Sequence, residues 1–323
     1  MIRPEPLVVA PIPVSRPWGG TYLAKPGPNG PIGEVWLFSL YPGYVSTVAE
    51  GPYAGQPLTA LFAKAPQDWL GEKAAHTFAG GYPLLVKLLD AAAPLSVQVH
   101  PSAAQCAALG HGQPKHEMWY VLCANPGGRM LVGLTHEATR SQIEQAIHDH
   151  TLQTLLNHYE PALHDYFELP PGTIHSLGPG LVVLEVQQQS DTTFRLYDWG
   201  RVDAQGKPRQ LHLHDGLQCV DLKPYTHPLP AAQAPGDWTL LSHNPHFVTY
   251  RLQAPASPTS CPLPSADMPW VLYAAQGRAQ LRFPGKAPQY LPPDRVLFVP
   301  PTTPQPPYVL LEPEATLLAC SLR

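Results

Sequence analysis

The sequence is poor in charge and has no dense run of basic side chains. Only 14% of its 323 residues are charged, and the net charge is −4. A nucleic acid or a membrane surface is therefore not expected as a partner, because anionic surfaces are usually bound through clustered lysines and arginines. A local basic pocket for a small anion is compatible with this composition.

Paired cysteines, a signal peptide and long apolar runs are also missing. The five cysteines form no Cys-x-x-Cys pair, and their odd number and scattered spacing favour reduced thiols in a cytoplasm. The N-terminus, MIRPEPLVVAPIPV, lacks the basic and then apolar layout of a secretory signal. The longest apolar run, YPLLVKLLDAAAPLSVQV, is interrupted by charges and prolines and predicts no membrane span. We therefore expect a cytoplasmic protein, and no sequence feature indicates its oligomeric state.

Proline and glycine, by contrast, are abundant, with 42 and 25 residues spread along the chain. This pattern predicts a mainly β protein in which short strands are joined by turns. Helical spacing of apolar residues is clearest at about 58–80 and 135–160. A proline-rich linker is expected near 224–236, and strand-like runs fill 237–323.

One strand carries polar side chains where a core strand would carry leucine or isoleucine. In LSVQVHPS, Val97 and Val99 alternate with Gln98 and His100, and the strand breaks at proline. Gln98 and His100 therefore point to the same face. Their lone pairs indicate a site on that face.

Two later segments carry side chains that could share a ligand-binding site with Gln98 and His100. QPKHEMWYVL carries Glu117 at the start of a strand, and LPPGTIHS carries His175 after a Pro-x-Gly turn. Nitrogen and oxygen ligands of this kind suit zinc or another divalent ion that keeps an open position.

His116 should point to the opposite face from Glu117, so it is not expected to be a ligand. His212 and His214 repeat the His-x-His spacing at a predicted helix start, where side chains two apart diverge, and are not expected to bind metal either.

The Pro-x-Gly-x-x-His turn resembles the second sequence motif of cupins, and the Gln-x-His strand followed by a glutamate resembles the first. Longer stretches are similar to type I phosphomannose isomerases in their shorter bacterial form: PLLVKLLDAAAPLSVQVHPS, PKHEMWYVL, LPPGTIHSLGPGLVVLEVQQQSDTTFRLYDWGR and PRQLH. The resemblance covers roughly residues 15–215. It implies two cupin-like jelly-roll β-barrels with a small α-helical insert in or beside the first. The first domain, 1–230, would be catalytic and include the helical segments, and the second, 237–323, would be a degenerate barrel without metal.

The same resemblance implies a set of functional residues. It places one zinc ion per chain on four ligands: Gln98, His100, Glu117 and His175. It assigns catalysis to Arg195, Lys87 and His100. It assigns contacts with a sugar phosphate to Lys115, Arg195 and Arg201. The implied reaction is the interconversion of mannose 6-phosphate and fructose 6-phosphate through a cis-enediol.

Other interpretations of these residues stay open. A cupin that binds a sugar or sugar phosphate without isomerising it, as a sensor, would keep part of the same site. A metal-dependent oxygenase would use redox-active iron on an open facial triad. Lys87 could also be a lysine whose stem packs on the sheet while its amine reaches water. Metal content and turnover separate these possibilities.

Overall fold

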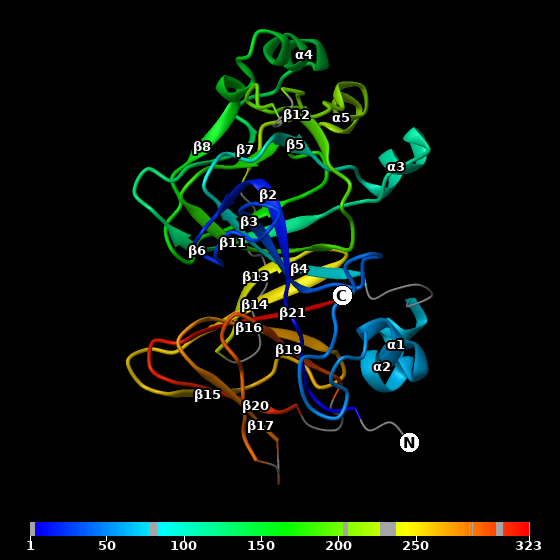
Figure 1. Ribbon diagram of the computed structural model, residues 1–323, viewed down its shortest axis with the longest axis vertical. Coiled ribbons are helices and arrows are strands. Elements are labelled where there is room, and N and C mark those ends of the chain that lie inside the picture. The colour runs from blue at the N-terminus through cyan, green and yellow to red at the C-terminus, as the bar shows by residue number, and fades with distance from the viewer. Residues whose placement is uncertain are drawn as a thin grey trace. The chain divides into compact units, whose positions relative to one another are not determined.

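The protein was analysed as a computed structural model and consists mainly of β-strands, as the proline and glycine content predicts (Figure 1). The structure describes these residues: 4–77, 83–202, 206–226, 237–283, 285, 287–301 and 306–322. The chain folds into two compact units. The middle unit comprises Pro13–Val35 and Leu88–Pro228. The C-terminal unit comprises Met1–Ile12, Trp36–Lys87 and Leu229–Arg323. No helix among the described residues has the length and hydropathy needed to span a membrane.

This division cuts the chain at more places than the single boundary expected near 230–237. Residues 1–12 and 36–87 group with the C-terminal segment, and Leu7 and Val8 pair with Phe298 and Leu297 of that segment. The predicted linker lies largely outside the described residues, at 227–236. The assignment of catalysis to the first domain alone stays a prediction.

The middle unit is built on two sheets. A six-stranded sheet has the order β2-β3-β4-β11-β6-β9, and strands β3 and β4 each contribute residues to both units. Its strands are β2 (Ile12–Gly20), β3 (Ile32–Phe38), β4 (Leu84–Ala91), β6 (Glu117–Ala124), β9 (Tyr166–Leu169) and β11 (Leu181–Gln188). A five-stranded sheet has the order β12-β5-β10-β7-β8. Its strands are β5 (Val97–Val99), β7 (Met130–Leu134), β8 (Leu156–Tyr159), β10 (His175–Leu177) and β12 (Phe194–Tyr197).

The two faces of the five-stranded sheet bury different cores. Val97 and Val99 pack with Ile143 and Leu217, which come from the helices that cover one face (Figure 1). On the other face, Val132 joins apolar residues of the six-stranded sheet in a separate cluster. Since side chains alternate along a strand, the residues between the two valines must point toward this second, inter-sheet face.

The helices of the middle unit are short: α3 (Ala103–Leu109), α4 (Arg140–His148), the 3₁₀ turn η1 (Leu152–Leu155) and α5 (Leu213–Cys219). Ser102 caps α3 by accepting a hydrogen bond from the Gln105 amide, and Gly110 ends it in the left-handed conformation. Both roles follow from the sequence.

The expected helical stretch 135–160 is helical at Arg140–His148 and Leu152–Leu155, but the expectation is wrong for its last residues. Helix α4 ends before His150, which has φ of 59° and cannot continue a right-handed helix. Residues 156–159 form strand β8, which pairs with β7. The Asn157 amide donates to carbonyl groups of β7, so pairing with a distant strand overrides the local helical spacing. The other expected helix, 58–80, is confirmed over its described part, and 78–80 lie outside the described residues.

The C-terminal unit also contains two sheets, of orders β1-β19-β16-β21-β14-β13 and β15-β20-β17-β18. Strands of the first are β1 (Leu7–Val8), β13 (Thr239–His243), β14 (Phe247–Gln253), β16 (Trp270–Gln276), β19 (Val296–Val299) and β21 (Thr316–Leu322). Strands of the second are β15 (Thr259–Pro262), β17 (Ala279–Arg282), β18 (Gln289–Tyr290) and β20 (Tyr308–Leu311). Two helices belong to this unit: α1 (Leu58–Lys64) and α2 (Pro66–Thr77).

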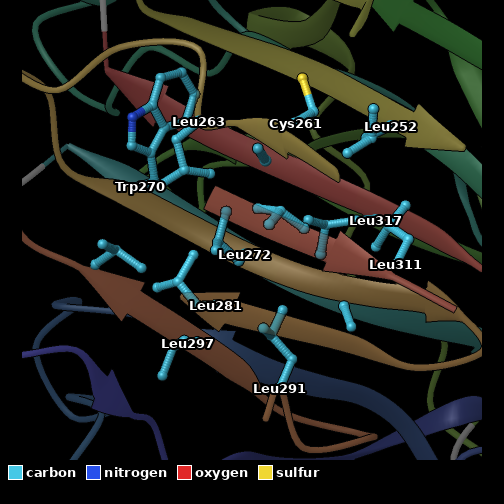
Figure 2. Close-up of a cluster of buried hydrophobic side chains, with 14 of the residues drawn as sticks. Leu252, Cys261, Leu263, Trp270, Leu272, Leu281, Leu291, Leu297, Leu311 and Leu317 are labelled. Atoms are coloured by element: carbon cyan, nitrogen blue, oxygen red, sulfur yellow. The ribbon is translucent and has the colours of Figure 1, made fainter. Parts of the chain in front are cut away.

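The two sheets of the C-terminal unit bury a large apolar cluster. Leu272 and Leu317 of one sheet pack with Leu281 and Leu311 of the other, and Trp270 belongs to the same cluster (Figure 2). No titratable carboxylate or imidazole belongs to this cluster of described residues, so it serves packing. That this unit binds no metal stays a prediction.

A tight turn delivers β10 to the middle unit. The Thr173 amide donates to the Pro170 carbonyl at 3.1 Å, and Gly172, at the third position, has φ of 93°. Proline second and glycine third is the pattern of a type II turn. The Gly172 amide also donates to the His100 carbonyl at 2.9 Å, which ties the turn to the end of β5. A Cβ on Gly172 would lie 3.0 Å from the Cys219 carbonyl oxygen.

We expect Gly172→Ala to lower the free energy of unfolding by about 1–3 kcal/mol, because alanine disfavours this φ and its Cβ meets backbone. Urea unfolding with a fluorescence readout measures the change. Gly127→Ala is the matched control, since Gly127 has φ of 81° with no atom within 4 Å of its Cβ position. An equal loss in both variants would contradict the argument that close backbone approach adds to the cost.

Candidate active site

A row of polar residues crosses the five-stranded sheet. In the strand register, Gln98 pairs with Arg195 on one side and with His175 on the other, and His175 pairs with Val132. Directly paired residues project to the same face. Because Val132 belongs to the inter-sheet core, the row faces the interior between the two sheets. The polar side chains of LSVQVHPS therefore point into the unit and not to solvent.

Two histidines are oriented by backbone carbonyls. Nδ1 of His100 lies 2.8 Å from the Thr192 carbonyl oxygen, and Nδ1 of His175 lies 2.8 Å from the Thr173 carbonyl oxygen. A carbonyl only accepts, so both Nδ1 atoms carry the proton and both Nε2 atoms keep a lone pair. This arrangement of imidazoles is typical of metal-ligating histidines.

Both lone pairs are directed at the carboxylate of Glu117. Its Oε1 lies 3.1 Å from His175 Nε2, and its Oε2 lies 3.5 Å from His100 Nε2. Glu117 is fully buried, and neither oxygen makes a hydrogen bond of suitable geometry with the described residues. Lone pairs that converge on one buried carboxylate form an arrangement suited to a bound cation.

The three side chains form a group that could hold a metal ion. Their ligand atoms lie within 4.8 Å of one another, and all three residues are buried. Among the described ranges this is the one such group of histidine, cysteine, aspartate or glutamate. Imidazole nitrogen with carboxylate oxygen suits a divalent ion, and three protein ligands leave a position open. The donor set therefore fits a catalytic type of metal centre.

Gln98 borders this group. Its Nε2 lies 3.3 Å from His175 Nε2, and its Oε1 accepts a hydrogen bond from the Ser96 hydroxyl. Rotation of the amide by half a turn would bring the oxygen to the place of the nitrogen, since the two ends have the same shape. A fourth ligand role for Gln98 stays a prediction.

A buried lysine places a positive charge beside the Glu117 carboxylate. Lys115 Nζ lies 2.6 Å from Glu117 Oε2 and 3.2 Å from His100 Nε2. Burial alone would lower the pKa of Lys115, but the carboxylates of Glu117 and Glu185 outweigh it and raise this pKa. Despite burial, Lys115 in turn holds the pKa of Glu117 well below its usual value. Burial and the charge of Lys115 lower the pKa of His100 to about 3. The imidazole is thus neutral and the carboxylate ionised, which are the forms that bind metal.

Sequence reasoning missed Glu185, which lies beside this group. It pairs with Trp119 in the register of β11 and β6, and its Oε2 accepts a hydrogen bond from the Trp119 indole at 2.9 Å. Its Oε1 lies 3.9 Å from Lys115 Nζ. A single carboxylate within the apolar strand LVVLEVQ was the signal that could have identified it.

The predicted residues Arg195 and Arg201 lie in a second polar cluster. Arg201 donates to Asp198 at 2.5 Å, and Arg209, which the sequence reasoning did not select, donates to both oxygens of Asp198. Arg195 Nη1 donates to the Gln210 carbonyl at 2.7 Å. Arg209 belongs to PRQLH, one of the segments similar to phosphomannose isomerases, and this segment could have identified it.

Three further histidines considered from the sequence lie outside the metal group. His116 Nε2 lies 2.6 Å from Glu168 Oε1, in agreement with its expected orientation away from the ligands. His212 Nδ1 accepts a hydrogen bond from the Arg195 amide, and His214 contacts Gln218. The His-x-His pair of α5 is therefore used for backbone and surface contacts.

Lys87, the predicted proton carrier, belongs to the C-terminal unit by the division of the chain. Its side chain is buried, and its Nζ lies 4.5 Å from the centroid of the Trp36 ring. The amine is therefore not the solvated group of a surface lysine. Its part in proton transfer stays a prediction.

Comparison with known proteins agrees with this arrangement. A family model described as phosphomannose isomerase type I, catalytic domain, matches residues 18–141. Mannose-6-phosphate isomerase from Streptococcus mutans is 35% identical over 260 residues, which are 78% of this chain and 80% of that protein. A mannose-6-phosphate isomerase from Bacillus subtilis is 36% identical over 223 residues, 68% of this chain and 69% of that protein.

A solved structure of the Bacillus subtilis mannose 6-phosphate isomerase has the same fold. It superposes with a TM-score of 0.80 at 25% identity and covers 98% of this chain and 99% of that one. The mainly β architecture expected from the resemblance is thereby confirmed. The sequence identity and coverage together show that the chain belongs to the type I phosphomannose isomerase family.

Proposed function

We propose that the protein is a metal-dependent aldose–ketose isomerase that interconverts mannose 6-phosphate and fructose 6-phosphate through a cis-enediol. The single observation that carries the proposal is the convergence of His100, Glu117 and His175 on one buried point, in a chain of this family. Lys115 already pairs with the Glu117 carboxylate, so what a cation would offset is the mutual repulsion of the lone pairs on His100, Glu117 and His175 that face one another.

We assign the metal to four side chains: Gln98, His100, Glu117 and His175. Zinc, one ion per chain, is the proposed metal, because neutral imidazole and carboxylate are among its usual ligands. When bound, a divalent ion supplies Lewis-acid stabilisation for charge that develops on the sugar oxygens.

The remaining residues act on the open-chain sugar. A proton must leave C2 of the aldose and arrive at C1 of the ketose. We assign this transfer to Lys87, with His100 aiding ring opening, and Arg195 to the developing oxyanion. Lys115 and Arg201 are assigned to contacts with the sugar phosphate, Lys115 at the metal end, where its Nζ lies 2.6 Å from Glu117 Oε2, and Arg201 at the phosphate end. A cytoplasmic location and a sugar phosphate as the partner belong to the same proposal.

No specific observation favours a sugar sensor or an oxygenase, and a turnover assay separates all three functions. The sensor would bind mannose 6-phosphate without forming fructose 6-phosphate. The oxygenase would contain iron and consume oxygen. Free aldoses such as mannose are a further candidate substrate that the same assay measures.

Chelation should abolish formation of fructose 6-phosphate from mannose 6-phosphate, and zinc should restore it. A coupled assay of fructose 6-phosphate before and after chelator treatment measures this, with oxygen uptake recorded in parallel. The expectation follows from the open position of a three- or four-ligand centre. Unchanged turnover in a sample shown to be metal-free would refute metal dependence.

His175→Ala should reduce bound metal to well below one ion per chain and lower kcat at least about a hundredfold, because it removes a ligand whose lone pair faces Glu117. Metal content by mass spectrometry and kcat are both measured on the folded variant. His148→Ala, on the exposed side of α4, is the matched control and should change neither value. Full turnover of the metal-free His175→Ala protein would contradict the assignment.

A further inference from the structure

The turn that follows β12 holds two charged residues side by side. It runs from Asp198 to Arg201, whose amide donates to the Asp198 carbonyl at 3.1 Å. Trp199 and Gly200 have φ of 59° and 67°, and positive values at both central positions are typical of a type I′ turn. The Trp199 indole donates to the Leu95 carbonyl at 2.6 Å, which anchors a bulky residue in a conformation it disfavours. Strain of this kind marks a turn that the surrounding structure specifies.

The chain then returns to place a third arginine at this turn. Val202 and Pro208 form an antiparallel bridge, and the His212 amide donates to the Arg195 carbonyl at 2.8 Å. Between these two contacts lies Arg209. Its guanidinium donates Nε to Asp198 Oδ2 at 2.7 Å and Nη2 to the other oxygen. This fork-to-carboxylate geometry fixes Asp198 in two directions.

The cluster has an excess of positive charge. It contains three guanidinium groups and one carboxylate, of Arg195, Arg201, Arg209 and Asp198, which is three positive charges against one negative. Burial and the nearby Arg209 lower the pKa of Arg195, a sign of crowded cations. Burial would raise the pKa of Asp198, but hydrogen bonds from Arg209 and Arg201 hold it low, so the carboxylate is ionised.

Several donors of the cluster have no acceptor. They are Nε of Arg195 and both Nε and Nη1 of Arg201, which solvent does not reach and for which no described residue accepts a hydrogen bond. Buried guanidinium donors without partners are costly. A phosphate dianion would match the excess of two positive charges, and its oxygens suit guanidinium groups.

The position of the cluster relative to the metal group suits a sugar phosphate. Arg195 pairs with Gln98, which pairs with His175, so Arg195 lies two strands from the histidine on one face of the sheet. Two strand spacings amount to roughly 10 Å. The reacting carbons and the phosphate of an open-chain hexose phosphate lie at opposite ends of the molecule.

We propose that Asp198 and Arg209 are positioning residues that make the site select phosphorylated sugars: Arg209 holds Asp198, and Asp198 fixes the orientation of the Arg201 guanidinium for the phosphate. The inference rests on the proposed function and adds two residues to it. Neither residue is a catalytic group, because each acts through another side chain.

Replacing Asp198 by asparagine separates two explanations of phosphate binding, because they predict opposite changes in affinity. If the cluster attracted phosphate only by net charge, Asp198→Asn would strengthen binding, because it removes a negative charge. If Asp198 positions Arg201, the variant should weaken binding although the site becomes more positive. We expect KM for mannose 6-phosphate to rise roughly tenfold while kcat stays within about twofold.

Arg209→Lys should act in the same direction, since lysine keeps the charge but cannot bridge both carboxylate oxygens. The matched control is Arg129→Lys, an exposed arginine that pairs with Glu160, and it should leave KM unchanged. For unphosphorylated mannose, kcat/KM should be the same in all variants that retain the wild-type melting temperature. A general loss of structure would instead lower kcat for both sugars.

An unchanged or lower KM in Asp198→Asn would overturn the proposal. Calorimetric titration of inorganic phosphate into the wild-type and variant proteins gives a second readout that needs no turnover. If the wild-type protein fails to isomerise mannose 6-phosphate, the proposed function fails. Weaker phosphate binding by Asp198→Asn would then still support the positioning role, and equal or tighter binding would exclude it.

Discussion

The burial of the Glu117 carboxylate is the constraint on which the site depends. A fully buried anion must be compensated, and here the compensation comes from the ammonium of Lys115 and from a position between two imidazoles suited to a cation. The neutral form of His100 follows from the same burial. The carbonyls of Thr192 and Thr173 then fix which nitrogen of each ring faces the carboxylate. The same buried contacts therefore set the charge of Glu117, the tautomers of His100 and His175, and the orientation of both rings.

A single strand connects the two polar parts of the middle unit. Strand β5 carries Gln98, and its neighbours β10 and β12 carry His175 and Arg195 in the same row. Because paired strands keep a fixed spacing, the group of His100, Glu117 and His175 and the arginine cluster are held at a constant distance. The helix-covered core behind Val97 and Val99 stabilises the strand from its other face. Rigid spacing of this kind suits a substrate with a reactive end and a phosphate end.

Much of the fold could be predicted from local patterns. Strand β6 begins at Glu117, as the sequence predicts, and helix α3 begins after its capping residue Ser102, because each boundary is set by its own residues. Residues 156–159 were predicted helical and form a strand, since their conformation depends on a partner strand distant in sequence. Glu185 and Arg209 were missed for the same reason. Nothing near either residue in the sequence reveals the Trp119 indole or the Asp198 carboxylate that it meets.

The sequence by itself determined the chemistry of the ligands, the turn that precedes His175 and the family to which the chain belongs. Alternation along a strand, the conformational preference of Gly172 and a capping serine are properties of a few adjacent residues. Only the tertiary structure decided that Lys115 is compensated by Glu117, and that Asp198 joins Arg201 to Arg209. These contacts depend on strand register and on the return of the chain after a turn, which pairings distant in sequence determine.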